Sequence, residues 1–95
     1  MCDKNPKCVE LTFADTIPML MSSDYKERFK AEYLQTKIRY EKLKKFNNKI
    51  EAARYTGCDE PKHDCPSDLL REQQRVMGEY LHILEVRAEI EDIAF

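Results

Sequence analysis

Two long stretches with apolar residues at helical spacing, separated by one short break, constrain this chain more than any other feature. Along residues 24–55 and again along residues 66–92, apolar or aromatic side chains recur every three or four positions, which is the period of a helix with one buried face. The break between them contains Gly57 and Pro61 among small polar residues, a composition that ends helices and turns the chain. The pattern therefore predicts an antiparallel helical hairpin.

The 95 residues suffice for one small domain. Its predicted parts are a loosely held arm, a short helix, a long helix, a loop and a second long helix, over residues 1–12, 13–22, 24–55, 56–65 and 66–92. Asp15 or Thr16 is the expected cap of the short helix, and Asp24 with Glu27 has the spacing of a capping box for the first long helix. We expect one all-α domain over residues 1–95.

The second long helix carries more apolar surface than one neighbour can cover. Its central stripe and the apolar residues beside it together occupy about half of the helical circumference. The central stripe is Leu70, Met77, Leu81, Leu84 and Ala88, and the flanking residues are Leu69, Val76, Tyr80, Ile83 and Ile90. Two helices alone would leave much of this surface in water. We therefore expect the hairpins to assemble into a homo-oligomeric helical bundle.

Charge is distributed unevenly behind a formal net charge of −2. Residues 24–54 hold ten Lys or Arg and five Asp or Glu, whereas residues 66–95 hold three and seven. An acidic chain would repel much of a duplex phosphate backbone, so we expect no duplex nucleic acid as a partner. Two interpretations of the basic helix stay open: a solvated face neutralised in part by the acidic helix, or a surface for a small phosphate-bearing ligand.

Nothing in the sequence indicates catalysis. The two glycines, Gly57 and Gly78, stand alone, which excludes the glycine-rich loops of P-loop and Rossmann nucleotide sites. Serines and cysteines fall in loops, caps or the terminal arm, without a base at a fixed spacing. Glu79 and His82 form an E-x-x-H motif, but a helical wheel points both away from the central stripe, whereas di-iron ligands must face inward. We expect a protein that is not an enzyme.

The four cysteines give no complete metal site. Cys2 and Cys8 are separated by five residues and Cys58 and Cys65 by six, wider than the pairs of typical structural zinc sites. Cys58, His63 and Cys65 supply three ligands where structural zinc takes four. We expect no metal and no cofactor, with the cysteines present as reduced thiols.

Tyrosines stand beside cations along both long helices, a pairing that can stack a base and hold a phosphate. Tyr25 is followed by Arg28, and Tyr40 directly follows Arg39. The alternative is that these tyrosines belong to the core or to an interface, as tyrosines on a helical stripe commonly do. The residues alone leave both interpretations open.

Two blocks of the sequence carry a family resemblance, YKERFKAEYLQTKIRYEKLK at 25–44 and CPSDLLREQQRVMGEYLHILEVRAEIE at 65–91. They resemble a group of small phage and prophage proteins related to a family first named from crAss-like phage, with the pattern YKxRFxAEYxQxKxRYxKL followed by LLxEQxxxMxxYLxxLExRAxIE. The two blocks coincide with the two predicted long helices. Small helical phage proteins of this size resemble counter-defence proteins, some of which are oligomeric sponges for host immune nucleotides.

The resemblance implies a non-enzymatic anti-defence protein of the host bacterial cytoplasm, which sequesters a cyclic oligonucleotide or an ADP-ribose-type signal in pockets between protomers. Carried onto this sequence, the ligand-binding residues are Tyr25, Arg28, Tyr33, Lys37, Arg39, Tyr40, Gln73, Tyr80 and Arg87. The alternatives are a protein-binding adaptor or inhibitor that uses an exposed apolar helical surface, and a structural or packaging accessory. Because the sequence has no apolar run of membrane-spanning length and no signal-peptide core, we expect no membrane partner.

Overall fold

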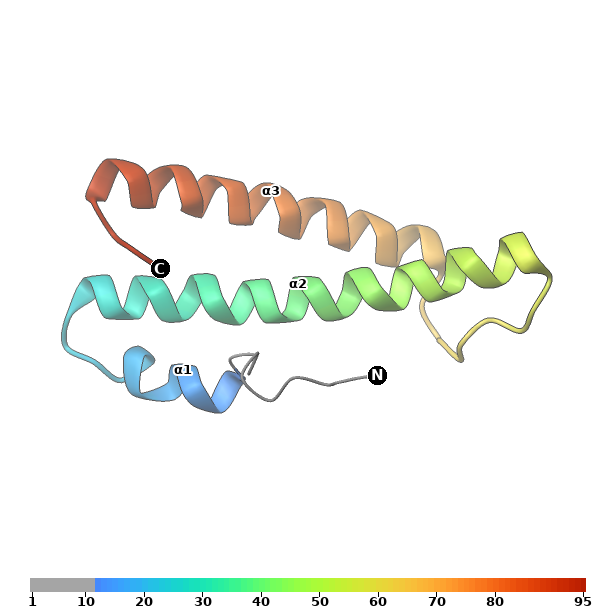
Figure 1. The fold of residues 1–95 in the computed structure, drawn as a ribbon, viewed down its shortest axis with the longest axis horizontal. Helices are drawn as coiled ribbons and strands as arrows, with labels where there is room; N and C mark the ends of the chain where they lie inside the picture. The colour runs from blue at the N-terminus through green and yellow to red at the C-terminus, as the bar shows by residue number, and fades with distance from the viewer. Residues whose placement is uncertain (1–11) are drawn as a thin grey trace, which may run out of the picture.

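The computed structural model describes residues 12–95, which form three helices and no strand. α1 spans Phe13–Leu20, α2 spans Tyr25–Thr56 and α3 spans Ser67–Glu91. α2 lies in the middle; α3 runs back along one face of it, and α1 packs on the opposite face (Figure 1). The predicted all-helical class is confirmed. Residues 1–11 of the predicted arm, with Cys2 and Cys8, lie outside the described residues.

The start of α1 differs from the prediction. Thr12 is the N-cap residue, and its backbone N–H donates a 2.9 Å hydrogen bond to the carboxylate of Asp15 in the first turn. Thr16 is fully buried, and its hydroxyl donates to the carbonyl of Phe13 at 2.7 Å. Neither Asp15 nor Thr16 is the N-cap residue, because the helix begins earlier than either; Asp15 instead completes a capping box from the first turn.

Asp24 caps α2, as predicted, by accepting a 3.0 Å hydrogen bond from the backbone N–H of Lys26. The reciprocal half of the capping box is absent here. The N–H of Asp24 instead donates to the hydroxyl of Ser22 at 3.0 Å, and the Glu27 carboxylate pairs with Lys30 at 3.3 Å. The Ser22 hydroxyl therefore accepts the hydrogen bond from the Asp24 N–H that the glutamate of a capping box would otherwise accept.

The core lies mainly between α2 and α3. Its buried members are Phe29, Tyr33, Leu81, Leu84, Ala88 and Ile93. Asn47 is also buried on this face, and its side-chain amide donates to the carbonyl of Leu70 at 3.2 Å and to Gln74 at 2.9 Å. The α2 residues in this core belong to the stripe that the helical period predicts as the packing seam.

The face of α2 opposite to α3 is covered by α1. Ala31 has no exposed surface, and the Gln35 side chain donates a 2.8 Å hydrogen bond to the buried hydroxyl of Thr16. Leu34 and Ile38 add apolar side chains to this face, and both are partly buried. Within residues 12–95, no helix combines the length and the apolarity needed to cross a membrane.

After α3 the chain turns back onto the core, a feature that the sequence does not predict. Asp92 adopts a left-handed conformation with φ of 57°, and the N–H of Ile93 then donates to the carbonyl of Ala88 at 2.8 Å. Ile93 is buried, and the ring of Phe95 stacks on the ring of Tyr33 with centroids 3.9 Å apart. The C-terminal segment thus fastens the end of α3 to the start of α2.

Candidate ligand-binding face

Five of the predicted ligand-binding residues border one side of the α2–α3 pair, which we call the Tyr25 side. Residues seven apart on a helix return to nearly the same angle, and this spacing makes a row on each helix. The rows are Tyr25, Glu32 and Arg39 on α2, and Gln73, Tyr80 and Arg87 on α3. Because Arg87 donates a hydrogen bond to the hydroxyl of Tyr25, both rows border the same side.

The end of this side is a small network of aromatic and charged groups. The hydroxyl of Tyr25 donates a 3.0 Å hydrogen bond to Glu91, and Arg87 donates to the same carboxylate at 3.1 Å. The Arg87 guanidinium also lies over the ring of Phe29, 4.8 Å from its centroid, a cation–π arrangement. Glu32 adds a further negative charge nearby. Phe29, Glu32 and Glu91 were absent from the predicted set.

The protonation states at this end follow from those contacts. Loss of water raises the pKa of the Tyr25 hydroxyl, and the hydrogen bond to Glu91 raises it further. The hydrogen bond to Glu91 is also the main cause that raises the pKa of Arg87, so its guanidinium stays charged. Arg87 is already engaged, whereas Arg39 is exposed and makes no ion pair with any residue in the described range.

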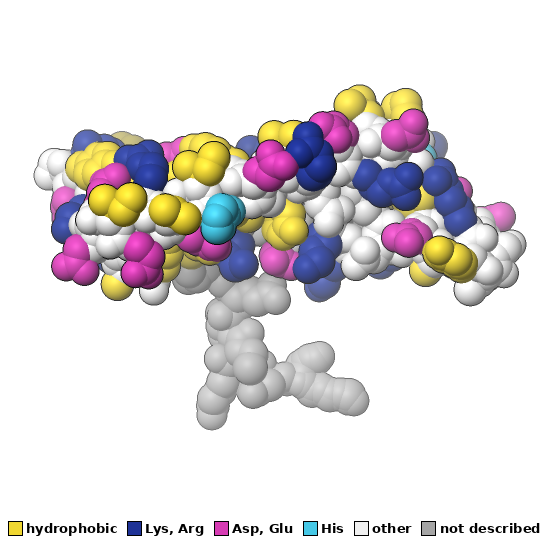
Figure 2. Space-filling view, turned by 90° about the horizontal axis from the view of Figure 1, so that it is seen from above, with side chains coloured by type: hydrophobic (Ala, Val, Ile, Leu, Met, Phe, Trp, Pro, Cys, Tyr) yellow, Lys and Arg dark blue, Asp and Glu magenta, His cyan; other side chains and the backbone are white. Residues whose placement is uncertain are grey.

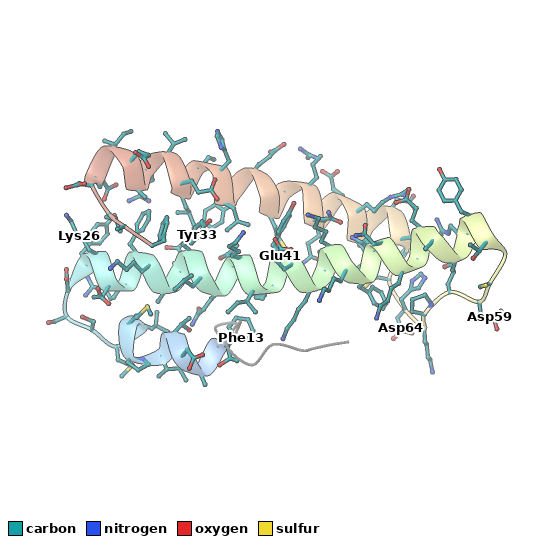
Figure 3. The ribbon with its side chains drawn as sticks, viewed as in Figure 1. Phe13, Lys26, Tyr33, Glu41, Asp59 and Asp64 are labelled. Atoms are coloured by element: carbon teal, nitrogen blue, oxygen red, sulfur yellow. The ribbon has the colours of Figure 1, made fainter. Side chains whose placement is uncertain are left out.

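Tyr33 and Lys37 lie on the other side of the pair. The Tyr33 side chain stands between α2 and α3 beside the C-terminal segment (Figure 3), and its hydroxyl donates a 2.6 Å hydrogen bond to Glu85. Burial, followed by the hydrogen bond to Glu85, raises the pKa of Tyr33 to about 12. Lys37 pairs with Glu41 at 3.7 Å across one helical turn. These groups cannot join Tyr25 and Arg39 around one small ligand of the same protomer.

Two predicted residues have structural contacts instead. Arg28 donates a 2.9 Å hydrogen bond to the carbonyl of Ser22 and so fixes the connection between α1 and α2. Tyr40 is partly buried in the seam, where its ring packs against Gly78 of α3. The geometry therefore divides the predicted set between the Tyr25 side, the Tyr33 side and the framework of the fold.

A separate groove runs between the start of α1 and the middle of α2. It has a cavity volume of about 500 Å³, and its lining residues are Thr12, Leu34, Lys37, Ile38, Glu41, Lys42 and Lys45. Lys42 also lies over the ring of Phe13, with its ammonium 5.7 Å from the centroid. Of these lysines, the predicted set included only Lys37. Positions 38, 42 and 45 share one helical face, and this spacing could have indicated that Lys42 and Lys45 line the same groove.

The outward face of α3 carries exposed apolar side chains at seven-residue intervals. Leu69, Val76, Ile83 and Ile90 are between 45 and 80 % exposed, and we call them the α3 stripe. Figure 2 shows the molecule from the α3 side, with apolar side chains standing among charged ones. The stripe lies beside the row of Gln73, Tyr80 and Arg87 on the same helix.

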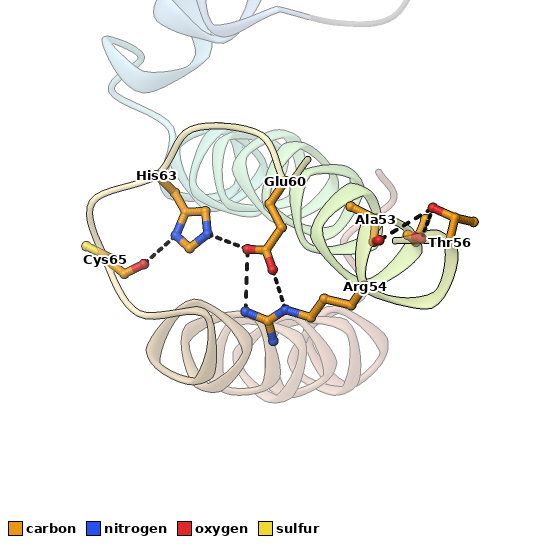
Figure 4. A network of polar contacts seen from close by, with 7 residues as sticks. Ala53, Arg54, Thr56, Glu60, His63 and Cys65 are labelled. Atoms are coloured by element: carbon orange, nitrogen blue, oxygen red, sulfur yellow. Dashed lines mark hydrogen bonds and ion pairs between the residues drawn. The ribbon is translucent and has the colours of Figure 1, made fainter. Parts of the chain in front are cut away.

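The loop between α2 and α3 is closed by a polar network (Figure 4). Arg54 and His63 both bind the carboxylate of Glu60, at 2.6 and 3.1 Å, and the second ring nitrogen of His63 lies 2.7 Å from the carbonyl of Cys65. These contacts hold the loop that the sequence placed as a turn. Cys58 is an exposed free thiol, as is Cys65.

Metal-binding geometry is absent from residues 12–95, where no three His, Cys, Asp or Glu side chains gather around a common point. Glu79 of the E-x-x-H motif forms an ion pair with Arg75, and His82 is exposed on α3. Both side chains of the motif therefore lie on the solvated face of the helix.

Comparison with known proteins finds one family. The family model described as Sequestin matches residues 23–90, which span α2, the connecting loop and nearly all of α3. No curated protein matches the chain, and no solved structure matches it.

Proposed function

Because this chain belongs to the Sequestin family, we propose that it is a non-enzymatic protein that binds and sequesters a small nucleotide signal. The family name is consistent with sequestering a molecule. The two blocks that resemble phage and prophage proteins favour a counter-defence role in a bacterial host cytoplasm, in which the sequestered signal is one made by host immunity.

The observation that carries the proposal is the arrangement of the Tyr25 side. Arg39 can contact a phosphate through its planar guanidinium, and its spacing places it in line with Tyr25 on α2. The ring of Tyr80 on α3 is partly exposed and can stack on a base. A nucleotide contains both groups, so a cyclic oligonucleotide or an ADP-ribose-type molecule fits this chemistry better than a purely apolar ligand does.

The proposal includes self-association. One α2–α3 pair gives an open face rather than an enclosed pocket, and a nucleotide held tightly enough to be withheld from a receptor needs most of its surface covered. A homo-oligomer with ligand pockets between protomers supplies that cover. The α3 stripe, which is exposed in the protomer, provides apolar surface for such an assembly.

Calorimetric titration of cyclic dinucleotides, cyclic trinucleotides and ADP-ribose isomers tests the proposal. We expect one class to bind, and Arg39→Ala to weaken it by about 1.5–3 kcal/mol, the range for a hydrogen bond to a charged group. Arg71→Ala is the matched control, because Arg71 is exposed on α3 but lies away from the Tyr25 side. If every class fails to bind below about 100 μM, sequestration of a nucleotide is rejected.

A protein-binding adaptor or inhibitor is the second candidate, and the exposed α3 stripe is the observation that favours it. An adaptor keeps its apolar surface open in the free protein, whereas the sequestering assembly covers it. Absence of nucleotide binding together with a stable free protomer is the combination that supports the adaptor.

A further inference from the structure

The spacing of the α3 stripe allows it to pack against the same stripe of a second copy. Leu69, Val76, Ile83 and Ile90 follow one another at steps of seven residues along the whole of α3. A strict seven-residue repeat is typical of a helix that packs along its length against another helix. Each of the four is exposed in the protomer, and Ile90 reaches 78 %.

An antiparallel pairing of two α3 helices brings this stripe into register about a twofold axis between Glu79 and Tyr80. In that register Leu69 faces the partner's Ile90, and Val76 faces the partner's Ile83. A twofold contact uses the same patch on both copies, so one stripe suffices to build both halves of the interface. The stripe therefore needs no unlike partner to be covered.

Charge favours the antiparallel direction over the parallel one. Residues 67–78 of α3 hold two arginines and two carboxylates, whereas residues 79–91 hold one arginine and four carboxylates. A parallel pair places the two acidic halves side by side, and like charges across a helical interface repel. An antiparallel pair places each acidic half beside a balanced one.

We propose that a second copy of this chain covers the α3 stripe, with the two α3 helices antiparallel. This inference rests on the oligomeric part of the proposed function and names the surface that forms the assembly. Gln73, Tyr80 and Arg87 border the stripe, so the contact brings the Tyr25 sides of both copies to the same interface. The partner's Tyr80 then lies beside Tyr80, and each site contains residues from two chains.

Light scattering after gel filtration measures the assembly directly. We expect the wild-type protein to run at twice its protomer mass of 11.3 kDa at micromolar concentration. Ile83→Glu is expected to return the protomer mass, because it places a carboxylate in the centre of the seam. Val76→Gln is a milder second variant that keeps the helix intact. Ile17→Glu is the matched control: Ile17 is 53 % exposed, but on α1, and the dimer should persist.

The direction of packing is tested by cross-linking, in a background with the four native cysteines replaced by serine. In the antiparallel pair the two copies of residue 90 lie about 30 Å apart along the seam, whereas a parallel pair sets them side by side. Ile90→Cys alone should therefore give no interchain disulfide under oxidation, and Leu69→Cys combined with Ile90→Cys should give one. A disulfide-linked dimer of the Ile90→Cys variant overturns the antiparallel direction.

The inference is overturned if the wild-type protein still runs at the protomer mass at about 50 μM, a concentration at which even a weak dimer forms. It is also overturned if Ile83→Glu and Val76→Gln both leave the dimer intact. Failure of the proposed function is separate from these results. A dimer that binds no nucleotide retains the interface and rejects sequestration. A nucleotide bound by a protomer retains sequestration and rejects the interface.

Discussion

Gly78 lies directly against the ring of Tyr40, such that a Cβ built on the glycine would stand 3.3 Å from the ring carbon Cε1. The absence of a side chain at this point allows α3 to pack closely on α2. Tyr40 is half-buried, so its ring has some room to move, but a branched side chain needs more space than a small shift provides.

Gly78→Val is therefore expected to lower the free energy of unfolding by about 1–3 kcal/mol, the usual cost of overpacking. Gly78→Ala should stay within about 1 kcal/mol of wild type, because better helix propensity offsets the tight contact. Urea unfolding followed by circular dichroism measures both. A valine variant as stable as the alanine variant contradicts the close packing.

The raised pKa of Tyr33 predicts that the protein loses stability in alkali. Its pKa is raised from 10.0 to about 12, by burial first and by the bond to Glu85 second. A group whose pKa is raised by folding stabilises the protein below the unfolded value, and that contribution is lost as pH rises through the folded value. The free energy of unfolding should fall between pH 10 and about 12, and Tyr33→Phe should remove part of that slope. Tyr55→Phe, at an exposed site, is the control.

The contacts of His63 predict that its imidazole loses its proton at a higher pH than an ordinary histidine does. Its pKa is raised above 6.5 chiefly by the hydrogen bond to Glu60 and then by the carbonyl of Cys65. The stabilisation it gives the loop is complete below pH 6.5 and is lost as pH rises through the raised pKa. Nuclear magnetic resonance of the imidazole should show Glu60→Gln lowering this pKa, with Glu79→Gln leaving it in place. Equal values in both variants would exclude Glu60 as the cause.

Arg28 is expected to affect stability rather than ligand binding. Its guanidinium holds the carbonyl of Ser22 between α1 and α2, at an exposed position. Arg28→Ala should lower the free energy of unfolding by about 0.5–1 kcal/mol, less than a buried charged hydrogen bond because water competes for it. Its affinity for any bound nucleotide should equal that of wild type, and a tenfold loss would return Arg28 to the site.

The sequence predicted most of the helical framework because its signals are local. Apolar period and the cap at Asp24 identify α2 and α3 within a residue or two of their observed ends. The start of α1 was harder to predict: Asp15 and Thr16 can both cap a helix, but Thr16 is buried against α2 and Asp15 accepts the N–H of Thr12 from within the first turn. Propensity alone does not contain that tertiary contact.

The candidate site was less predictable than the fold. A helical wheel places Tyr25 and Tyr33 on one packing stripe, yet the partner helix separates them, since Tyr25 reaches Glu91 and Tyr33 reaches Glu85. Which edge of a stripe faces which edge of its partner depends on how two helices rotate against each other, and a single sequence does not fix that rotation. The stacking of Phe95 on Tyr33 could not be predicted either, because it depends on the left-handed turn at Asp92 that directs the chain back onto the core.

The C-terminal segment that folds back onto the core makes the last turn of α3 harder to unfold locally than the first. At the far end, Ile93 is buried and Phe95 stacks on Tyr33, whereas the first turn follows Pro66 without a side-chain cap. Amide hydrogens should therefore exchange with solvent faster in the first turn than in the last. We expect local unfolding of α3 to start beside the loop and to stop before Arg87. The part of the Tyr25 side around Arg87 then stays folded while the part around Gln73 opens transiently.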